Sequence, residues 1–107
     1  MKRLAAIFAL LPALSQAGPY DGLCFAGGAC TGQIEIRNNG FDLCEHSCVM
    51  ENPVEVRGLN AMLWDVTCRG DYSTYSERML FAWVGKGTEM RLTVLSNDTV
   101  ETLWPCR

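Results

Sequence analysis

The chain contains 107 residues, of which 49% are hydrophobic, and its formal net charge is -3. This length allows one domain with a modest core. The segment 1–17 holds two of the nine Lys and Arg residues and none of the twelve acidic residues, so the rest of the chain has a charge of -5. A domain this acidic repels phosphate backbones, and we therefore expect no nucleic-acid partner.

The N-terminal segment has the three parts of a secretory signal peptide. Two basic residues precede an apolar run over 4–14, and the small residues Ser15 and Ala17 come just before the expected cleavage site. The apolar run is about half as long as a membrane-spanning helix, which needs ~20 residues. We therefore expect 1–17 to be a signal peptide, 18–107 to be a single periplasmic or secreted domain, and no membrane span to remain after cleavage.

Glycine and other turn residues divide the rest of the chain into short segments. The segment 18–32 is rich in glycine around two cysteines, which predicts an irregular N-terminal loop. Residues 41–50 are ambiguous between a helix and an extended chain. Apolar residues predict strands over 33–37, 54–57, 61–68, 78–84, 90–95 and 99–104, and the strand 61–68 carries Met62, Trp64, Val66 and Cys68 at alternate positions.

The spacing of these strands predicts the fold class. Turns such as Asn38-Asn39-Gly40 separate them, which is typical of a mainly β fold: a small antiparallel meander or a partly closed barrel, stapled by disulfides. The run 79–84 is apolar on both faces. This predicts a central strand that is covered on both sides, or a strand whose outer face meets a partner.

Six cysteines follow the expected cleavage site: Cys24, Cys30, Cys44, Cys48, Cys68 and Cys106. An even number of cysteines in a short exported chain is typical of a disulfide framework, and the spacing alone does not choose among the pairings. Pairing neighbours along the chain predicts Cys24–Cys30, Cys44–Cys48 and Cys68–Cys106. The third of these bridges would tie the last strand to an earlier one.

A metal site is the alternative for the middle of the chain. Cys44, His46, Cys48 and Met50 occupy every second position, so on a strand they would share one face. Sulfur and imidazole ligands of this kind suit copper(I) or zinc. The oxidising compartment and the even cysteine count favour disulfides instead, and we expect no cofactor.

Catalytic motifs are not recognisable in this chain. His46 is the single histidine, and no serine or cysteine lies in a sequence setting typical of an activated nucleophile. A chain this short also offers little room for a cleft between paired carboxylates. We therefore expect that the protein is not an enzyme.

The connection over 69–77 is the best candidate for binding. It is polar and carries Tyr72 and Tyr75 between two strong strand segments. Tyrosine offers a large rigid surface with one polar end, as in many recognition loops. The alternative is a plain hairpin whose tyrosines fold back on the sheet.

A small exported β domain clasped by cysteines resembles, in outline, the periplasmic lysozyme inhibitors. No residue of their inhibitory loops is matched in this chain. Our hypothesis is therefore a non-enzymatic, inhibitor-like binding domain whose ligand is a partner protein or a component of the cell envelope, with Tyr72 and Tyr75 as its binding residues. Periplasmic copper or zinc binding is the alternative function.

Overall fold

The computed structural model describes residues 18–28 and 32–106, so the predicted signal peptide and Cys30 lie outside the described residues. The strands are β1 (Leu23–Gly28), β2 (Gly32–Glu35), β3 (Gly40–Asp42), β4 (His46–Glu55), β5 (Ala61–Gly70), β6 (Thr74–Val84), β7 (Arg91–Leu95) and β8 (Val100–Pro105). A short 3-10 turn, η2 (Gly87–Glu89), separates β6 from β7.

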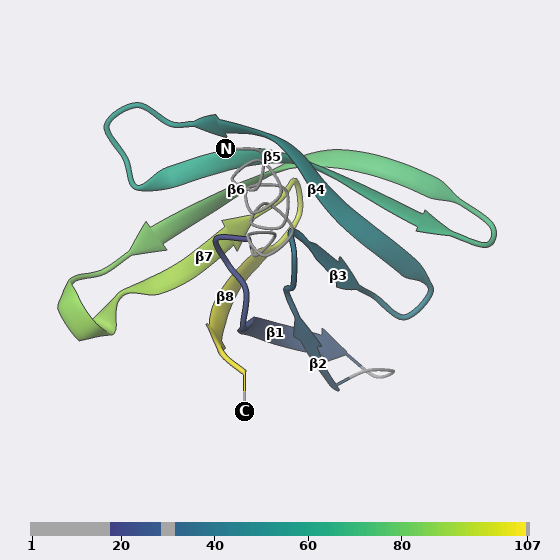
Figure 1. Ribbon diagram of the computed structural model, residues 1–107, viewed down its shortest axis with the longest axis horizontal. Helices are drawn as coiled ribbons and strands as arrows, with labels where there is room; N and C mark the ends of the chain where they lie inside the picture. Colours follow the sequence, from purple (N-terminus) through teal and green to yellow (C-terminus); the bar gives the residue numbers. More distant parts are fainter. Residues whose placement is uncertain (1–17, 29–31, 107) are drawn as a thin grey trace, which may run out of the picture.

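The strands form one antiparallel sheet that curls into a nearly closed barrel (Figure 1). The order along the sheet is β2-β1-β8-β7-β6-β5-β4-β3, so consecutive strands from β3 to β8 are neighbours. The last strand, β8, also pairs with the first, β1. This confirms the predicted fold class, a mainly β meander that is partly closed into a barrel and stapled by disulfides.

A tight turn brings the two edge strands, β2 and β3, together. Asn38 and Asn39 have φ angles of 53° and 58°, and the backbones of Arg37 and Gly40 exchange hydrogen bonds of 2.9 and 3.1 Å. Two left-handed residues inside such a bonded pair define a type I′ turn, which asparagine tolerates well. The predicted turn is confirmed, and it is the element that nearly closes the barrel.

The core lies inside the barrel and follows the alternation of the strands. Trp64, Val66 and Cys68 alternate along β5 and are buried, as the sequence predicts. Tyr20, which precedes β1, stacks on Phe81 and accepts a hydrogen bond of 3.0 Å from Trp64 Nε1. This bond satisfies the two polar atoms that these aromatic side chains bring into the core.

The glycine-rich segment 18–32 is more regular than its composition indicates. The sequence predicts an irregular loop, whereas Leu23–Gly28 form β1, which pairs with both β2 and β8. Cys24 is fully buried, while Leu23 and Phe25 pack against the core. Pairing on both sides therefore outweighs the low strand propensity of glycine.

The ambiguous segment 41–50 is extended rather than helical. It contributes the end of β3 and the first half of β4. Further along β4 the register shifts between Glu51 and Val54, and Asn52 has a φ of 55°. A proline is tolerated within a strand at such a bulge, which explains how β4 continues through Pro53.

The disulfides follow strand register and not proximity along the chain. Cys48 and Cys68 are bonded and lie directly opposite each other on β4 and β5, with Cα atoms 4.0 Å apart. Cys24 is bonded to Cys106 across the seam between β1 and β8, and Cys44 is also disulfide-bonded. The predicted pairs Cys24–Cys30, Cys44–Cys48 and Cys68–Cys106 are therefore wrong, while the predicted stapling is confirmed.

The two faces of β6 differ in their surroundings. Met79, Phe81 and Trp83 pack against the core, whereas Leu80 on the opposite face lies in an apolar row across five neighbouring strands. This outer apolar row consists of Val54, Leu63, Leu80, Leu95 and Val100. Val54, Leu95 and Val100 are exposed, so β6 is not covered on both sides within the described part of the chain.

Candidate functional site

A cavity of about 370 Å³ opens inside one end of the barrel. Its floor is formed by the core residues Ile36, Phe81 and Leu103, each at most 2% exposed. Phe25 and Phe41 form an aromatic wall, with ring centroids 5.5 Å apart in an edge-to-face arrangement. The cavity is therefore a continuation of the core that has been left open, and not a groove between surface loops.

The alternation of β6 places its side chains in this cavity. Tyr75, Glu77, Met79 and Phe81 occupy every second position and all line it. Their register partners on β5, which include the buried Val66 opposite Glu77, belong to the inner face as well. A carboxylate therefore faces the barrel interior in the middle of an otherwise apolar row.

Two further acidic residues line the cavity from the neighbouring hairpin. Glu101 lies on β8 opposite Val94, and Asp98 lies in the turn between β7 and β8. Within the described residues, Glu77 and Glu101 form no ion pair, and no Lys, Arg or His lines this cavity. The cavity thus combines an apolar floor with a set of carboxylates that lack a counter-charge.

The turn that carries Asp98 is held by local hydrogen bonds. The Ser96 amide donates to the Thr99 carbonyl at 3.0 Å, and the hydroxyls of these two residues lie 2.7 Å apart. Ser96 Oγ also donates to Asp98 Oδ1 at 3.4 Å. These contacts fix the Asp98 carboxylate beside the cavity, so it is part of a defined rim.

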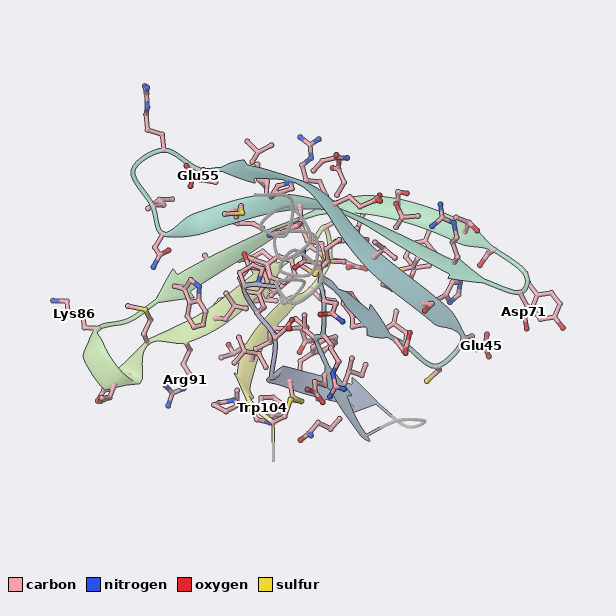
Figure 2. The ribbon with its side chains drawn as sticks, viewed as in Figure 1. Glu45, Glu55, Asp71, Lys86, Arg91 and Trp104 are labelled. Carbon is pink, nitrogen blue, oxygen red and sulfur yellow. A yellow bond between two sulfur atoms is a disulfide. The ribbon has the colours of Figure 1, made fainter. Side chains whose placement is uncertain are left out.

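The structure separates the two tyrosines of the predicted binding loop. The polar connection over 69–77 is shorter than predicted, because β5 and β6 extend into it and leave only 71–73 between them. Tyr72 is 97% exposed in this hairpin tip, whereas Tyr75 is 43% exposed, packs edge-on against His46 and lines the cavity. The tip containing Asp71 lies at the same end of the barrel as Glu45, opposite Glu55 (Figure 2).

The acidic and aromatic lining was not recognised in the sequence, although a signal for it exists. Glu77 is in phase with Met79, Phe81 and Trp83, and Glu101 is in phase with Leu103. A charged residue in the inward phase of a strand breaks the binary pattern. Such a break is typical of a functional position.

His46 bridges two loops at the rim of this end. Its Nε2 lies 2.9 Å from Ser73 Oγ, and both residues border a shallow hollow of about 300 Å³ together with Tyr72. No acidic side chain in the described segments hydrogen-bonds the other ring nitrogen. The pair therefore lacks the third member that orients the base in a catalytic triad.

The four residues of the alternative metal site are used differently. Cys48 is bonded to Cys68, Cys44 is disulfide-bonded, and Met50 is buried in the core. Among residues 18–28 and 32–106, no group of three or more His, Cys, Asp and Glu side chains is placed to hold a metal ion. A copper or zinc site here would first require reduction of the disulfides.

A second hollow, of about 560 Å³, lies at the opposite end of the barrel. It is lined mainly by the β4–β5 hairpin, with Glu55 and Arg57 supplying charges of both signs. Tyr20 and Phe81 also border it, and Phe81 lines both hollows. In contrast to the first cavity, this hollow has no bias in charge.

No protein family, no curated protein and no solved structure matches this chain. In the part of the chain that the structure describes, no helix is long and apolar enough to cross a membrane. The candidate site therefore rests on its own geometry: an open cavity in the barrel, aromatic walls and unpaired carboxylates.

Proposed function

We propose that this chain is a small exported, non-enzymatic binding domain whose ligand occupies the barrel cavity. The observation that carries the proposal is the cavity of about 370 Å³, which lies in the size range of ligand sites and is mostly apolar with a few convergent polar groups. The disulfides are consistent with an oxidising location, and we propose export by the 1–17 signal to a periplasmic or extracellular site.

The composition of the cavity supports binding over a structural role. A void in a core forfeits packing contacts, and a carboxylate on its wall is costly to desolvate. A domain of this size has little net stability to lose. An open interior that carries Glu77 and Glu101 is therefore better explained by a ligand than by packing.

A cavity-filling variant tests this proposal. Val94 lines the cavity on β7, whereas Val84 is exposed at the end of β6, so Val94→Phe and Val84→Phe are a matched pair. The neutral apolar dye N-phenylnaphthylamine serves as the probe, and its fluorescence reports binding. We expect the unmodified protein and Val84→Phe to bind the dye equally, and Val94→Phe to bind it at least about tenfold more weakly, because the added ring fills the cavity.

Circular dichroism of each variant provides the folding control. Equal dye affinity in the two folded variants, or no dye binding by the unmodified protein at millimolar concentration, would contradict the proposal.

Tyr72 favours a second candidate function at the same end of the barrel. Its side chain is 97% exposed at the hairpin tip, and aromatic side chains of this kind are common in protein interfaces. We propose a partner protein or an envelope component as its target. Leu59→Ala, in the exposed hairpin at the opposite end, is the control for Tyr72→Ala in affinity capture from cell envelopes. A partner retained equally by both variants would exclude the tip as the contact.

A further inference from the structure

We propose that the ligand of the barrel cavity is a small organic cation, namely a protonated amine on an apolar and preferably aromatic body. This inference rests on the proposed function and adds the chemical class of the ligand. Charge and ring chemistry on the cavity wall support it separately.

The first argument is charge complementarity. Glu77, Asp98 and Glu101 line the cavity, no basic side chain lines it, and the two glutamates have no ion-pair partner among the described residues. An apolar ligand that expels water from these carboxylates leaves them desolvated and unpaired, which is costly. An ammonium group would supply the missing partner, whereas an anion would be repelled by all three.

The second argument is the aromatic wall. Phe25, Phe41, Tyr75 and Phe81 all line the same cavity as the carboxylates. Aromatic ring faces attract organic cations, and the same rings bury the apolar part of a ligand. A site that combines carboxylates with several rings therefore suits an amine better than a neutral ligand.

The third argument separates an organic cation from a metal ion. The described residues contain no group of three or more His, Cys, Asp and Glu side chains placed to hold a metal. Hard cations such as calcium need several oxygen ligands, which rings and aliphatic side chains do not provide. The apolar floor of Ile36, Phe81 and Leu103 instead requires a ligand with an apolar body.

The net charge of the whole domain also favours a cationic ligand. The chain without its predicted signal peptide has a charge of -5. Such a field attracts cations to the mouth of the cavity at low salt and is screened at physiological ionic strength. Local contacts must therefore be separated from this general attraction in any test.

Three probes of similar shape make the test: naphthylethylammonium, naphthylethanol and naphthylpropionate, titrated calorimetrically into the folded protein. The variant Glu77→Gln/Glu101→Gln removes two carboxylates from the cavity. The variant Glu51→Gln/Glu55→Gln removes two exposed carboxylates that do not line it. Because both variants change the net charge equally, a difference between them reports the cavity alone.

We expect the ammonium probe to bind at least about tenfold more tightly than the alcohol, and the carboxylate probe to bind weakest. The cavity variant should lose about tenfold in ammonium affinity and bind the alcohol at least as tightly as the unmodified protein, because neutral amides cost less to desolvate than carboxylates. The control variant should change neither affinity.

If the alcohol binds as tightly as the ammonium probe, or the carboxylate binds best, the cation assignment is wrong and the binding cavity stands. An equal loss of ammonium affinity in the two variants would likewise overturn it. Absence of binding by all three probes would overturn the proposed function as well.

Discussion

Removing the disulfide at the β1–β8 seam should destabilise the fold more than removing the one between β4 and β5. The two double variants to be compared are Cys24→Ala/Cys106→Ala, which removes the seam disulfide, and Cys48→Ala/Cys68→Ala, which removes the β4–β5 disulfide. Alanine is chosen because Cys24, Cys48 and Cys68 are buried and Cys106 is half-buried, so a serine hydroxyl placed there would lack a partner. The prediction depends on how each bond restricts the unfolded chain and on how each seam is held without it.

The magnitudes follow from the sequence separations. The seam bond spans 82 residues and the β4–β5 bond spans 20. Loop-closure entropy gives about 4.5 kcal/mol for the first bond and about 3.3 kcal/mol for the second. A domain of this size has a free energy of unfolding of roughly 5–15 kcal/mol, so loss of the seam bond should remove between about a third and nearly all of it.

The local structure of the seam increases the difference. Strands β1 and β8 share only the register pairs Leu23–Pro105 and Cys24–Trp104, and proline has no amide hydrogen to donate. The Cys106 amide adds one hydrogen bond, of 2.9 Å, to the Gly22 carbonyl. Strands β4 and β5, in contrast, pair along most of their length, so they remain joined without their disulfide.

Urea denaturation followed by tryptophan fluorescence measures both variants, with the unmodified protein as reference. Because Phe25 and Leu103 lie on the seam strands and line the cavity, the seam variant should also bind N-phenylnaphthylamine more weakly. A larger loss of stability in the β4–β5 variant, or a loss below about 1 kcal/mol in the seam variant, would refute the reasoning.

Three further predictions concern aromatic residues. Burial raises the pKa of Tyr20 above its ordinary 10.0. The contribution of this side chain to stability is therefore complete below pH 10.0 and is lost as pH rises through the higher pKa of the folded state. Tyr20→Phe should remove the share of the alkaline fall in melting temperature that comes from this ionisation. Tyr72→Ala should change the free energy of unfolding by less than about 0.5 kcal/mol, whereas Tyr75→Ala, which loses its contact with His46, should cost about 1 kcal/mol in urea denaturation. Phe81→Ala should cost about 3–5 kcal/mol in the same assay, and a cost below about 1 kcal/mol would exclude this ring from the core.

Local patterns were sufficient to predict much of this fold. The alternation of Trp64, Val66 and Cys68 predicts the buried face of β5, and Asn38-Asn39-Gly40 predicts the turn that the structure contains. Both features depend on residues that are close in the chain. These features can be predicted from the sequence because strand alternation and left-handed turn geometry are properties of a few consecutive residues.

Long-range pairing was not predictable in the same way. The bond between Cys48 and Cys68 depends on the register of β4 against β5, and the bond between Cys24 and Cys106 depends on the pairing of β1 with β8. The strand character of the segment 23–28 has the same origin, since β8 supplies one of its partners. Composition and cysteine spacing do not determine which strands pair when they are distant in the sequence.

The candidate site was predicted only in part. Tyr75 does line the cavity, although it lies in β6 and not in a long loop as the sequence indicated. Glu77 and Glu101 were missed because an isolated glutamate in a strand is ordinarily placed on the solvent face. Their inward position becomes visible only when the phase of each strand is known.

The pairing of β1 with β8 places the first and last strands of the chain next to each other inside the sheet. Backbone atoms of Gly22 and Cys106 are hydrogen-bonded, so the chain just before β1 lies beside the chain just after β8. A short linker between these ends, with a new break at the exposed Arg57-Gly58 turn, would keep every strand next to its present neighbours. The molecule should therefore tolerate circular permutation, and its architecture should not depend on the order in which the strands are synthesised.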